Sequence, residues 1–377
     1  MGEHPHQPQT EIPNYPNLQN KYCVPEFVFV ACQVGAEGAV KGEVGREWPG
    51  FRLAFSRPGF LTFKLPEGHG LLGDFDLRSV FARAYGFSLG RVRGEGVEEA
   101  ARQVWELYGG RPVRCLHVWW RDRRPPGEHA TASLIPAAAE VREALRRLCP
   151  RSDALTGHPE QGSDVAQRGD FVLDCVVVEP GEWWVGYHRA SGPATCWPGG
   201  VPPIELPADA VNRTWLKMEE ALRWSELPIP RGARVAEIGS APGGSSQALL
   251  ARGLVVTGID PAAMDPRVLA HPHFTHVRRR AMAARRREFR KVRWVTADMN
   301  VAPKATLDAV EDIVTHREAR VRGLLLTLKL PDWKLAEQVP EYLARVRSWG
   351  YNLVRARQLY HNRQELCVAA LQKPFRR

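Results

Sequence analysis

The fold of this chain is decided by one stretch of its sequence, Val235-Ala-Glu-Ile-Gly-Ser-Ala-Pro-Gly-Gly-Ser-Ser-Gln247, which predicts a strand, a tight turn and a helix. Gly239, Gly243 and Gly244 let the backbone turn sharply and approach a ligand closely. The N-terminus of the helix presents free N–H groups to a carboxylate. Asp260 ends the next apolar run, where a carboxylate can accept both ribose hydroxyls of a nucleoside. A glycine turn followed by such an acid favours a nucleotide-type site over a purely structural turn.

Around this turn, from Ala208 onward, predicted helices and strands alternate. They are helix Arg213–Arg223, strand Arg234–Ile238, helix Gly244–Arg252, strand Val255–Ile259, a basic segment, strand Val292–Ala297, helix Leu307–Arg320, strand Gly323–Leu328, helix Leu335–Gly350 and strands Tyr351–Leu359 and Glu365–Leu371. Nearly continuous apolar strands between helices indicate a parallel sheet covered on both faces. The last two strands are joined by a short turn and should form an antiparallel hairpin. This α/β pattern, a mostly parallel sheet of the seven-stranded type ending in a hairpin, resembles the Rossmann-like methyltransferase fold.

The first half of the chain has a different pattern, mixed in order and with hairpin-like neighbours, which suggests α+β layers. Strands are predicted at Glu26–Gln33, Phe51–Ser56, Gly59–Lys64, Val113–Arg121, Phe171–Glu179 and Glu182–His188, and helices at Leu77–Ala84, Val97–Tyr108 and Ala137–Leu148. The predicted division is a disordered tail over 1–20, an α+β region over 21–191, a linker rich in proline and glycine over 192–207 and the α/β domain over 208–377.

Composition narrows the functional classes. The 377 residues carry 52 Lys and Arg against 42 Asp and Glu, a net charge of +10. This favours a polyanionic partner, although a generally basic, Arg-rich proteome explains it equally well. No run of 18 apolar residues and no secretory signal are present, so we expect a cytoplasmic protein without a membrane span. The seven cysteines are scattered without Cys-x-x-Cys pairs, which argues against a disulfide framework or a zinc site and fits a reducing compartment.

Four ionisable residues sit where they could share one site. Asp298 and Lys329 each end an apolar run, Glu365 opens another, and Lys217 lies in a helical stretch. Groups at strand ends of one sheet converge at one edge, where open α/β sheets bind ligands. Two lysines and two carboxylates brought together there favour proton-transfer chemistry, because each shifts the pKa of the others. For each residue taken singly, an ordinary surface charge is the alternative.

The glycine turn, Glu237-Ile-Gly-Ser-Ala-Pro-Gly-Gly-Ser245, resembles the S-adenosylmethionine loop of FtsJ-type RNA ribose 2′-O-methyltransferases, commonly Asp-Leu-Gly-Ala-x-Pro-Gly-Gly-Trp. Pro242 is characteristic of that family, whereas Ser245 replaces its tryptophan. The resemblance implies S-adenosyl-L-methionine as cofactor. The cofactor-binding residues that it implies are Thr214, Glu237, Gly239, Ala241, Pro242, Gly243, Gly244, Asp260 for the ribose and Asp298 near the methionine end. Where a subgroup of the family has another acid for the adenine, this chain has Arg280.

The same family uses a Lys-Asp-Lys-Glu tetrad, and four blocks match it. Thr214–Leu222, Thr296–Met299, Leu328–Pro331 and Leu359–Glu365 supply Lys217, Asp298, Lys329 and Glu365. Within the family the blocks most resemble subgroup M, the bacterial large-subunit rRNA cytidine 2′-O-methyltransferases. The resemblance implies that Lys329 is the general base for the ribose hydroxyl. That role needs a neutral lysine, so we expect its pKa, ordinarily about 10.4, to be depressed by desolvation and by Lys217, with Asp298 and Glu365 opposing the shift.

A basic run, Arg278–Arg293, follows the cofactor segment and holds nine basic residues in sixteen positions. A solvated helix face is the plain interpretation, and phosphate binding is the alternative beside a nucleoside-modifying site. The candidate RNA contacts are Arg278, Arg279, Arg285, Arg286, Arg287 and Lys291. His271, His273 and His276 have loose ligand-like spacing, but no acid or cysteine completes a set, so we expect no metal.

Arginines and aromatic residues are also mixed in the first half, at His117–Arg124 and Glu182–Arg189. The second block resembles the last strand of THUMP RNA-binding domains, with a ferredoxin-like unit before it. Such domains recognise folded RNA by shape and backbone. We therefore expect a methyltransferase acting on RNA, most simply large-subunit rRNA. The alternatives are an RNA-binding assembly factor that has lost catalysis and a 2′-O-methyltransferase for another RNA such as tRNA. The oligomeric state does not follow from the sequence.

Overall fold

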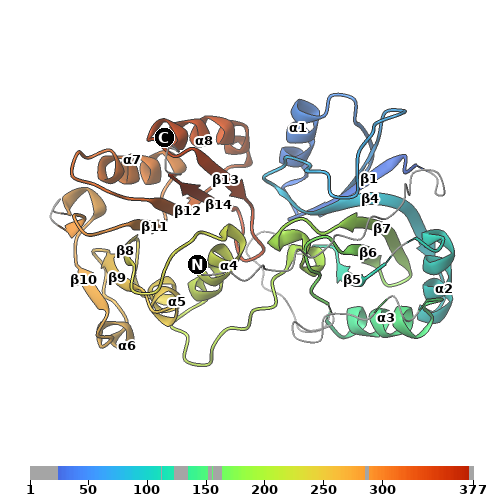
Figure 1. The fold of residues 1–377 in the computed structure, drawn as a ribbon, viewed down its shortest axis with the longest axis horizontal. Helices are drawn as coiled ribbons and strands as arrows, with labels where there is room; N and C mark the ends of the chain where they lie inside the picture. Colours follow the sequence, from blue (N-terminus) through green and yellow to red (C-terminus); the bar gives the residue numbers. More distant parts are fainter. Residues whose placement is uncertain are drawn as a thin grey trace, which may run out of the picture.

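The computed structural model describes residues 24–111, 113–122, 135–151, 155, 164–284 and 288–372 and contains two seven-stranded sheets, one in each half of the chain (Figure 1). The tail predicted at 1–20 lies outside these residues. In the parts of the chain that are described, no helix is both long and apolar enough to cross a membrane.

The N-terminal sheet has the strand order β2-β3-β1-β4-β7-β6-β5. Its strands are β1 (Phe27–Cys32), β2 (Arg52–Arg57), β3 (Phe60–Lys64), β4 (Ala82–Arg93), β5 (Cys115–Trp120), β6 (Phe171–Glu179) and β7 (Glu182–Arg189). Only β5 and β6 pair in parallel, and the remaining neighbours are antiparallel. Helices α2 (Val97–Tyr108) and α3 (Ile135–Arg147) share a buried apolar cluster with β5, β6 and β7, whereas α1 (Glu37–Glu47) contributes to a different cluster.

The C-terminal sheet has the order β10-β9-β8-β11-β12-β14-β13. Its strands are β8 (Arg234–Ile238), β9 (Val255–Ile259), β10 (Phe274–Val277), β11 (Trp294–Asp298), β12 (Gly323–Lys329), β13 (Leu353–Arg357) and β14 (Glu365–Leu371). The first five pair in parallel, and β14 runs antiparallel to both β12 and β13. The predicted α/β sheet ending in a hairpin is therefore confirmed. The strand order reverses between β8 and β11, the point where such sheets bind ligands.

Helices cover both faces of this sheet, which is why its strands are apolar throughout. They are α4 (Thr214–Ser225), α5 (Gly244–Ala251), the short α6 (Pro266–Leu269), α7 (Pro303–Val314) and α8 (Val339–Ser348), which the 3-10 turn η9 (Trp333–Gln338) precedes. Leu325 belongs to the apolar cluster that contains α4 and α5, and its neighbours Leu324 and Leu326 belong to the cluster that contains α7 and α8. The alternation along β12 thus sends successive side chains to opposite layers.

The two sheets are packed against each other through a shared core. One buried apolar cluster contains Val28 and Leu61 of the N-terminal sheet together with Leu328 and Leu330 of the C-terminal half. Residues 192–207 run between the sheets and form two short turns, η5 (Pro193–Thr195) and η6 (Pro198–Gly200). A Cβ on Gly199 would lie 2.8 Å from the Trp119 ring, so this segment is packed tightly on the end of β5.

Some elements differ from the prediction. The helix predicted at Leu77–Ala84 is wrong, because this segment is irregular up to the start of β4 at Ala82. Helix α1, the short helix α6 and strands β4 and β10 are additional elements that the sequence pattern did not indicate. Helix α1 contains three glycines and little segregation of polar from apolar residues, and β10 has only four residues, so neither has a clear periodicity.

Candidate active site

The four ionisable residues predicted to meet do meet. Lys217 comes from α4, Asp298 from the end of β11, Lys329 from the end of β12 and Glu365 from the start of β14. Glu365 bridges the two lysines, with 2.6 Å from its Oε2 to Lys217 Nζ and 2.6 Å from its Oε1 to Lys329 Nζ. Asp298 lies 3.2 Å from Lys329 Nζ and 3.8 Å from Lys217 Nζ. Each carboxylate therefore faces both ammonium groups, and the four form a closed ring of alternating charge.

Sheet register places two members of this ring. Lys329 and Glu365 are directly paired residues in the antiparallel ladder between β12 and β14. Asp298 is the last residue of β11, which pairs in parallel with β12. Three of the four side chains thus come from adjacent strands at the edge of the sheet beyond its parallel carboxyl ends, as the topology requires.

The protonation state of Lys329 differs from the sequence expectation. Burial lowers its pKa, but the charges of Asp298 and Glu365 and their hydrogen bonds raise it by more, so its pKa lies above the ordinary lysine value. The prediction of a depressed pKa is wrong for this arrangement. Its physical reason is proximity, since both carboxylates lie within 3.2 Å of the ammonium group.

The glycine turn between β8 and α5 lies beside this ring and has no room for side chains. A Cβ on Gly239 would lie 2.5 Å from the carbonyl oxygen of Asp298. A Cβ on Gly244 would lie 2.5 Å from Thr214 Oγ1 and closer still to Asn212 Oδ1. Gly239 and Gly243 also have φ values of 78° and 124°, which favour glycine. The turn is therefore a shallow backbone cradle next to Asp298 and the start of α4.

Asp260 braces this turn from the end of β9. Its Oδ2 accepts the N–H of Ala241 at 3.2 Å, and its Oδ1 accepts the N–H of Ala262 at 2.8 Å. Each carboxylate oxygen has a second lone pair, so the group can still accept ligand hydroxyls. Pro242 also has a structural contact, because its carbonyl accepts the N–H of Asp265 at 2.9 Å.

Glu237 and Ser245 lie under the turn. Glu237 is buried and accepts a hydrogen bond from Ser246, while its Oε1 has no hydrogen-bond partner among the described residues. Burial raises the pKa of Glu237 to about 8. Ser245, which replaces the tryptophan of the FtsJ-type loop, donates to the carbonyl of Thr214 at 3.3 Å and so ties α5 to the start of α4.

The segment before Glu365 is held by residues that the sequence interpretation missed. Glu220 is fully buried and accepts the N–H groups of Tyr360 and His361, each at 2.8 Å. Burial raises the pKa of Glu220 to about 7. The sequence contained a signal for Glu220, because it lies three residues after Lys217 and therefore on the same face of α4. Asn362 is also buried and lines a small hollow together with Lys217 and Asp298.

An open cavity of about 470 Å³ leads to the ring. It is lined by Lys329 and Glu365 and, around them, by residues of three loops, including Asn300, Pro331 and Arg363. Its size suits a nucleoside-sized group. A ligand in this cavity and a ligand on the glycine turn would meet at Asp298 and Lys329.

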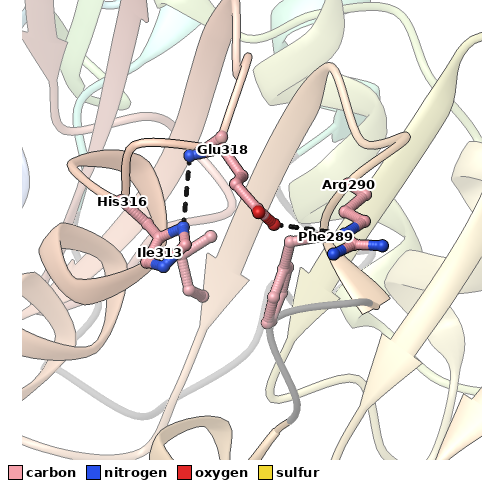
Figure 2. Close-up of a pocket in the computed structure, with 6 residues that line it drawn as sticks. Phe289, Arg290, Ile313, His316 and Glu318 are labelled. Atoms are coloured by element: carbon pink, nitrogen blue, oxygen red, sulfur yellow. Dashed lines mark hydrogen bonds and ion pairs between the residues drawn. The ribbon is translucent and has the colours of Figure 1, made fainter.

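The basic run is exposed. Arg278, Arg279, Arg280 and Lys291 are exposed, and Arg285, Arg286 and Arg287 lie outside the described residues. In the described part of the run there is a short 3-10 turn, η7 (Ala281–Ala283), and no α-helix, so the helix-face interpretation does not hold there. Arg278 Nε donates to the carbonyl of Pro261, next to Asp260. Figure 2 shows Arg290 paired with Glu318 beside His316.

The histidines of this region do not gather around a ligand. His276 Nε2 is 3.0 Å from the carbonyl of Asp260, and His271 and His273 form a ring pair with centroids 5.8 Å apart. Within the described ranges, no group of three or more His, Cys, Asp or Glu residues could hold a metal ion.

Comparison with known proteins gives consistent matches. A model of the FtsJ-like methyltransferase family matches residues 210–342. Ribosomal RNA large subunit methyltransferase M of Halorhodospira halophila is 36% identical over 350 residues, covering 90% of this chain and 95% of that protein. The protein of the same name from Hahella chejuensis is 28% identical, covering 79% and 75%. The crystal structure of TrmN from Thermus thermophilus has a TM-score of only 0.33 at 16% identity, covering 92% and 99%. The match to the Halorhodospira halophila protein shows that the chain belongs to the family of ribosomal RNA large subunit methyltransferase M, with an FtsJ-like methyltransferase region.

Proposed function

We propose that this protein transfers a methyl group from S-adenosylmethionine to a ribose 2′-hydroxyl of large-subunit rRNA. The observation that carries the proposal is the ring formed by Lys217, Asp298, Lys329 and Glu365 beside a glycine turn, in a chain of this family. The reaction needs a group that takes the hydroxyl proton and groups that orient it.

The turn fits the cofactor. Its glycines leave the backbone without side chains, and Asp260 has lone pairs that can accept ribose hydroxyls. Glu237 carries a buried oxygen without a hydrogen-bond partner among the described residues. Gly239, Gly243 and Gly244 would hold the methionine part near Asp298, and Thr214, Ala241 and Pro242 would complete the wall. When bound there, S-adenosylmethionine supplies a methyl group activated by a positively charged sulfur.

The ring supplies the proton chemistry. Lys329, once neutral, would take the proton of the 2′-hydroxyl on its Nζ as that oxygen accepts the methyl group, whose bond to the sulfur would break. Glu365 and Asp298 hold Lys329 in place and stabilise the charge that it gains. Lys217, bound to Glu365 at 2.6 Å, fixes the orientation of that carboxylate. General-base assistance of this kind supplies about 10²–10⁴-fold.

The N-terminal half is proposed to hold the RNA, as a ferredoxin-like and THUMP-like unit over 21–191 joined to the catalytic domain (208–377) by residues 192–207. Exposed arginines at 278, 279 and 280 with Lys291 offer phosphate contacts near the cofactor turn. A cytoplasmic site of action belongs to this proposal, because its substrate is ribosomal RNA.

The test uses rRNA from cells that lack the gene. We expect the purified protein to restore a 2′-O-methyl group on large-subunit rRNA, detected by nuclease digestion and mass spectrometry. Lys329→Ala should lower the rate by about 10²–10⁴-fold while calorimetry still shows S-adenosylmethionine binding. Exposed Lys334 provides the matched control, and Lys334→Ala should act as wild type. Wild-type rates in Lys329→Ala would refute the assignment of the base.

A second candidate is an assembly factor without catalysis. The contacts within the ring argue against it, because an unused site has no need of two carboxylates, each with a side chain 11% exposed, facing two lysines. Calorimetry separates the two candidates, since the assembly factor should not bind S-adenosylmethionine. Methylation of tRNA instead of rRNA in the same assay would change the substrate and leave the chemistry as proposed.

A further inference from the structure

A second large cavity lies between the two halves of the molecule, separate from the glycine turn. Its volume is about 490 Å³, in the range of small-ligand sites. Trp119 and Trp120 line it from the end of β5, Arg142 from α3, Pro202 from the segment between the sheets and Tyr360 from the loop before β14. The reaction derived above does not use this cavity.

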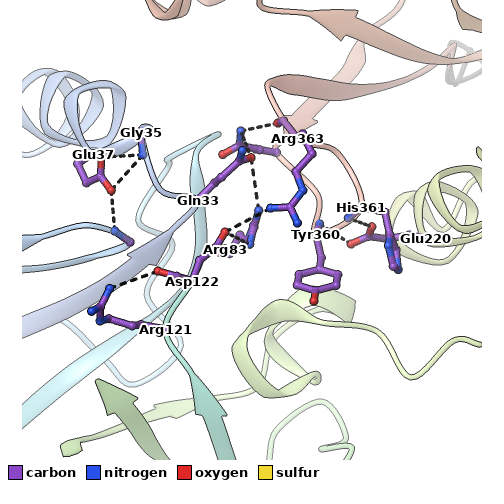
Figure 3. Close-up of polar contacts among 12 residues, drawn as sticks. Gln33, Gly35, Glu37, Arg83, Arg121, Asp122, Glu220, Tyr360, His361 and Arg363 are labelled. Carbon is purple, nitrogen blue, oxygen red and sulfur yellow. Dashed lines mark hydrogen bonds and ion pairs between the residues drawn. The ribbon is translucent and has the colours of Figure 1, made fainter. Parts of the chain in front are cut away.

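The walls combine flat rings with arginines. The Arg83 guanidinium lies 5.4 Å from the centroid of the Tyr360 ring and donates to Asp122 at 3.2 Å (Figure 3). Arg83, Arg121 and Arg142 all contribute to the lining, against the carboxylates of Asp122 and Asp164. Aromatic residues interleaved with arginines are the surface on which unpaired bases of RNA stack.

Buried donors in this wall are unused by the protein. The indole N–H of Trp119 and the Nε of Arg83 are buried and have no hydrogen-bond acceptor among the described residues. Leaving a buried donor unsatisfied costs about 1–3 kcal/mol, so a small rotation of either side chain toward the cavity would be favoured by a ligand rich in acceptors. A nucleobase offers ring nitrogens and carbonyl oxygens together with a flat face.

The position of the cavity connects it to the reaction site. Asp122, on its wall, forms an ion pair with Arg363 at 3.8 Å. Arg363 in turn lines the cavity that contains Lys329 and Glu365. The ion pair between Asp122 and Arg363 thus joins the walls of the two cavities.

We propose that this cavity binds an unpaired nucleotide of the substrate RNA next to the methylated one, its base stacked against the aromatic lining. The proposal rests on the proposed function, because it takes RNA as the substrate. It adds a requirement that the methylated nucleotide be flanked by one that can leave a helix.

The first test blocks the cavity. Ala139, on α3, lines it, so Ala139→Trp fills the space that the base would take. We expect this variant to bind large-subunit rRNA from gene-deleted cells on the order of tenfold more weakly, as for loss of one stacked base, with unchanged binding of S-adenosylmethionine. Glu140 is the adjacent exposed residue of α3, and Glu140→Trp should bind RNA as wild type.

A second measurement does not depend on a variant that folds or on methyl transfer. Ultraviolet cross-linking of the wild-type protein to the same rRNA, followed by mass spectrometry, should place a nucleotide adduct on Trp119, Trp120 or Tyr360. The proposal would be overturned if the adducts were confined to other peptides and Ala139→Trp bound RNA with wild-type affinity. If the protein still methylated the rRNA in that case, the proposed function would stand. If the wild-type protein methylated no ribose but gave the adduct, the proposed reaction would fail and the nucleotide site would stand.

Discussion

At the Lys329 side chain, two requirements oppose each other. As the proposed base, the lysine must be neutral to accept a proton, yet Asp298 and Glu365 hold its pKa above the ordinary value. The four site residues could be predicted from the sequence because each ends a strand or lies in a motif. The sign of the pKa shift could not, since it depends on distances of 2.6 and 3.2 Å between side chains far apart in the sequence.

This leads to a prediction about pH. The folded enzyme keeps Lys329 charged. While the pH is below the pKa of Lys329, the neutral fraction of its amine increases about tenfold with each unit by which the pH rises. We expect kcat/KM, measured with S-adenosylmethionine as the varied substrate, to rise continuously from pH 7 to 9. A plateau reached below pH 8 would show that the base has a depressed pKa and is not the lysine in this arrangement.

Glu237 gives a prediction about stability. Its pKa of about 8 in the folded protein, against an ordinary 4.5, means that the folded state binds this proton more tightly than the unfolded chain. Its contribution is therefore fully present below pH 4.5 and is lost as pH rises to 8. The side chain in Glu237→Gln cannot titrate. Between pH 5 and 9 the free energy of unfolding of this variant should therefore rise relative to that of wild type, by on the order of several kcal/mol. Melting temperatures measured across this pH range should show the same trend. A constant difference across this range would contradict the assignment.

Among the elements, the turn between β8 and α5 has little room for added side chains. Gly244 faces Asn212 and Thr214 so closely that a methyl group cannot fit. We expect Gly244→Ala to displace the start of α4, to lower stability by about 1–3 kcal/mol and to weaken S-adenosylmethionine binding in calorimetry. Gly38 in α1 is the control, since no atom lies within 4 Å of a Cβ there. Gly38→Ala should be neutral or slightly stabilising, and equal effects of the two changes would argue against the steric reason.

Sequence periodicity predicted most elements of the C-terminal half, because its buried strands are short apolar runs between helices. It failed at β4, whose twelve residues include three arginines and two glycines. Such a strand is specified by its neighbours β1 and β7, which pair along it on both sides, rather than by its own composition. Contacts of this kind join residues 50 to 100 positions apart and leave no local pattern.

On the scale of the whole molecule, the two sheets are linked by buried polar contacts next to the active site (Figure 3). Gln358 donates to Gln33 at 3.0 Å, and Arg357 donates to the carbonyl of Arg83. Arg83 and Asp122, both from the N-terminal half, form an ion pair whose side chains are 6% and 4% exposed. The loop that carries Arg363 toward Glu365 is therefore held by the other half of the chain.

The corresponding prediction concerns Arg83. Arg83→Ala removes the partner at 3.2 Å from the buried carboxylate of Asp122, which costs about 3–5 kcal/mol in comparable sites. Urea unfolding should show this loss. Arg102 forms an exposed pair with Glu98, so Arg102→Ala should change stability by no more than about 0.5 kcal/mol. Similar values for the two variants would mean that the buried pair contributes no more to stability than the exposed one.

The ladder between β12 and β14 has a further consequence. Lys329 and Glu365 face each other as paired residues. The backbone hydrogen bonds of the ladder therefore set the spacing between the two residues. Inserting one residue within β14 would shift Glu365 to the opposite face and silence the enzyme even if the sheet still assembled. Lengthening the connection between β13 and β14 would leave that pairing untouched but would disturb the contacts of Tyr360, His361 and Arg363 with Glu220 and Asp122.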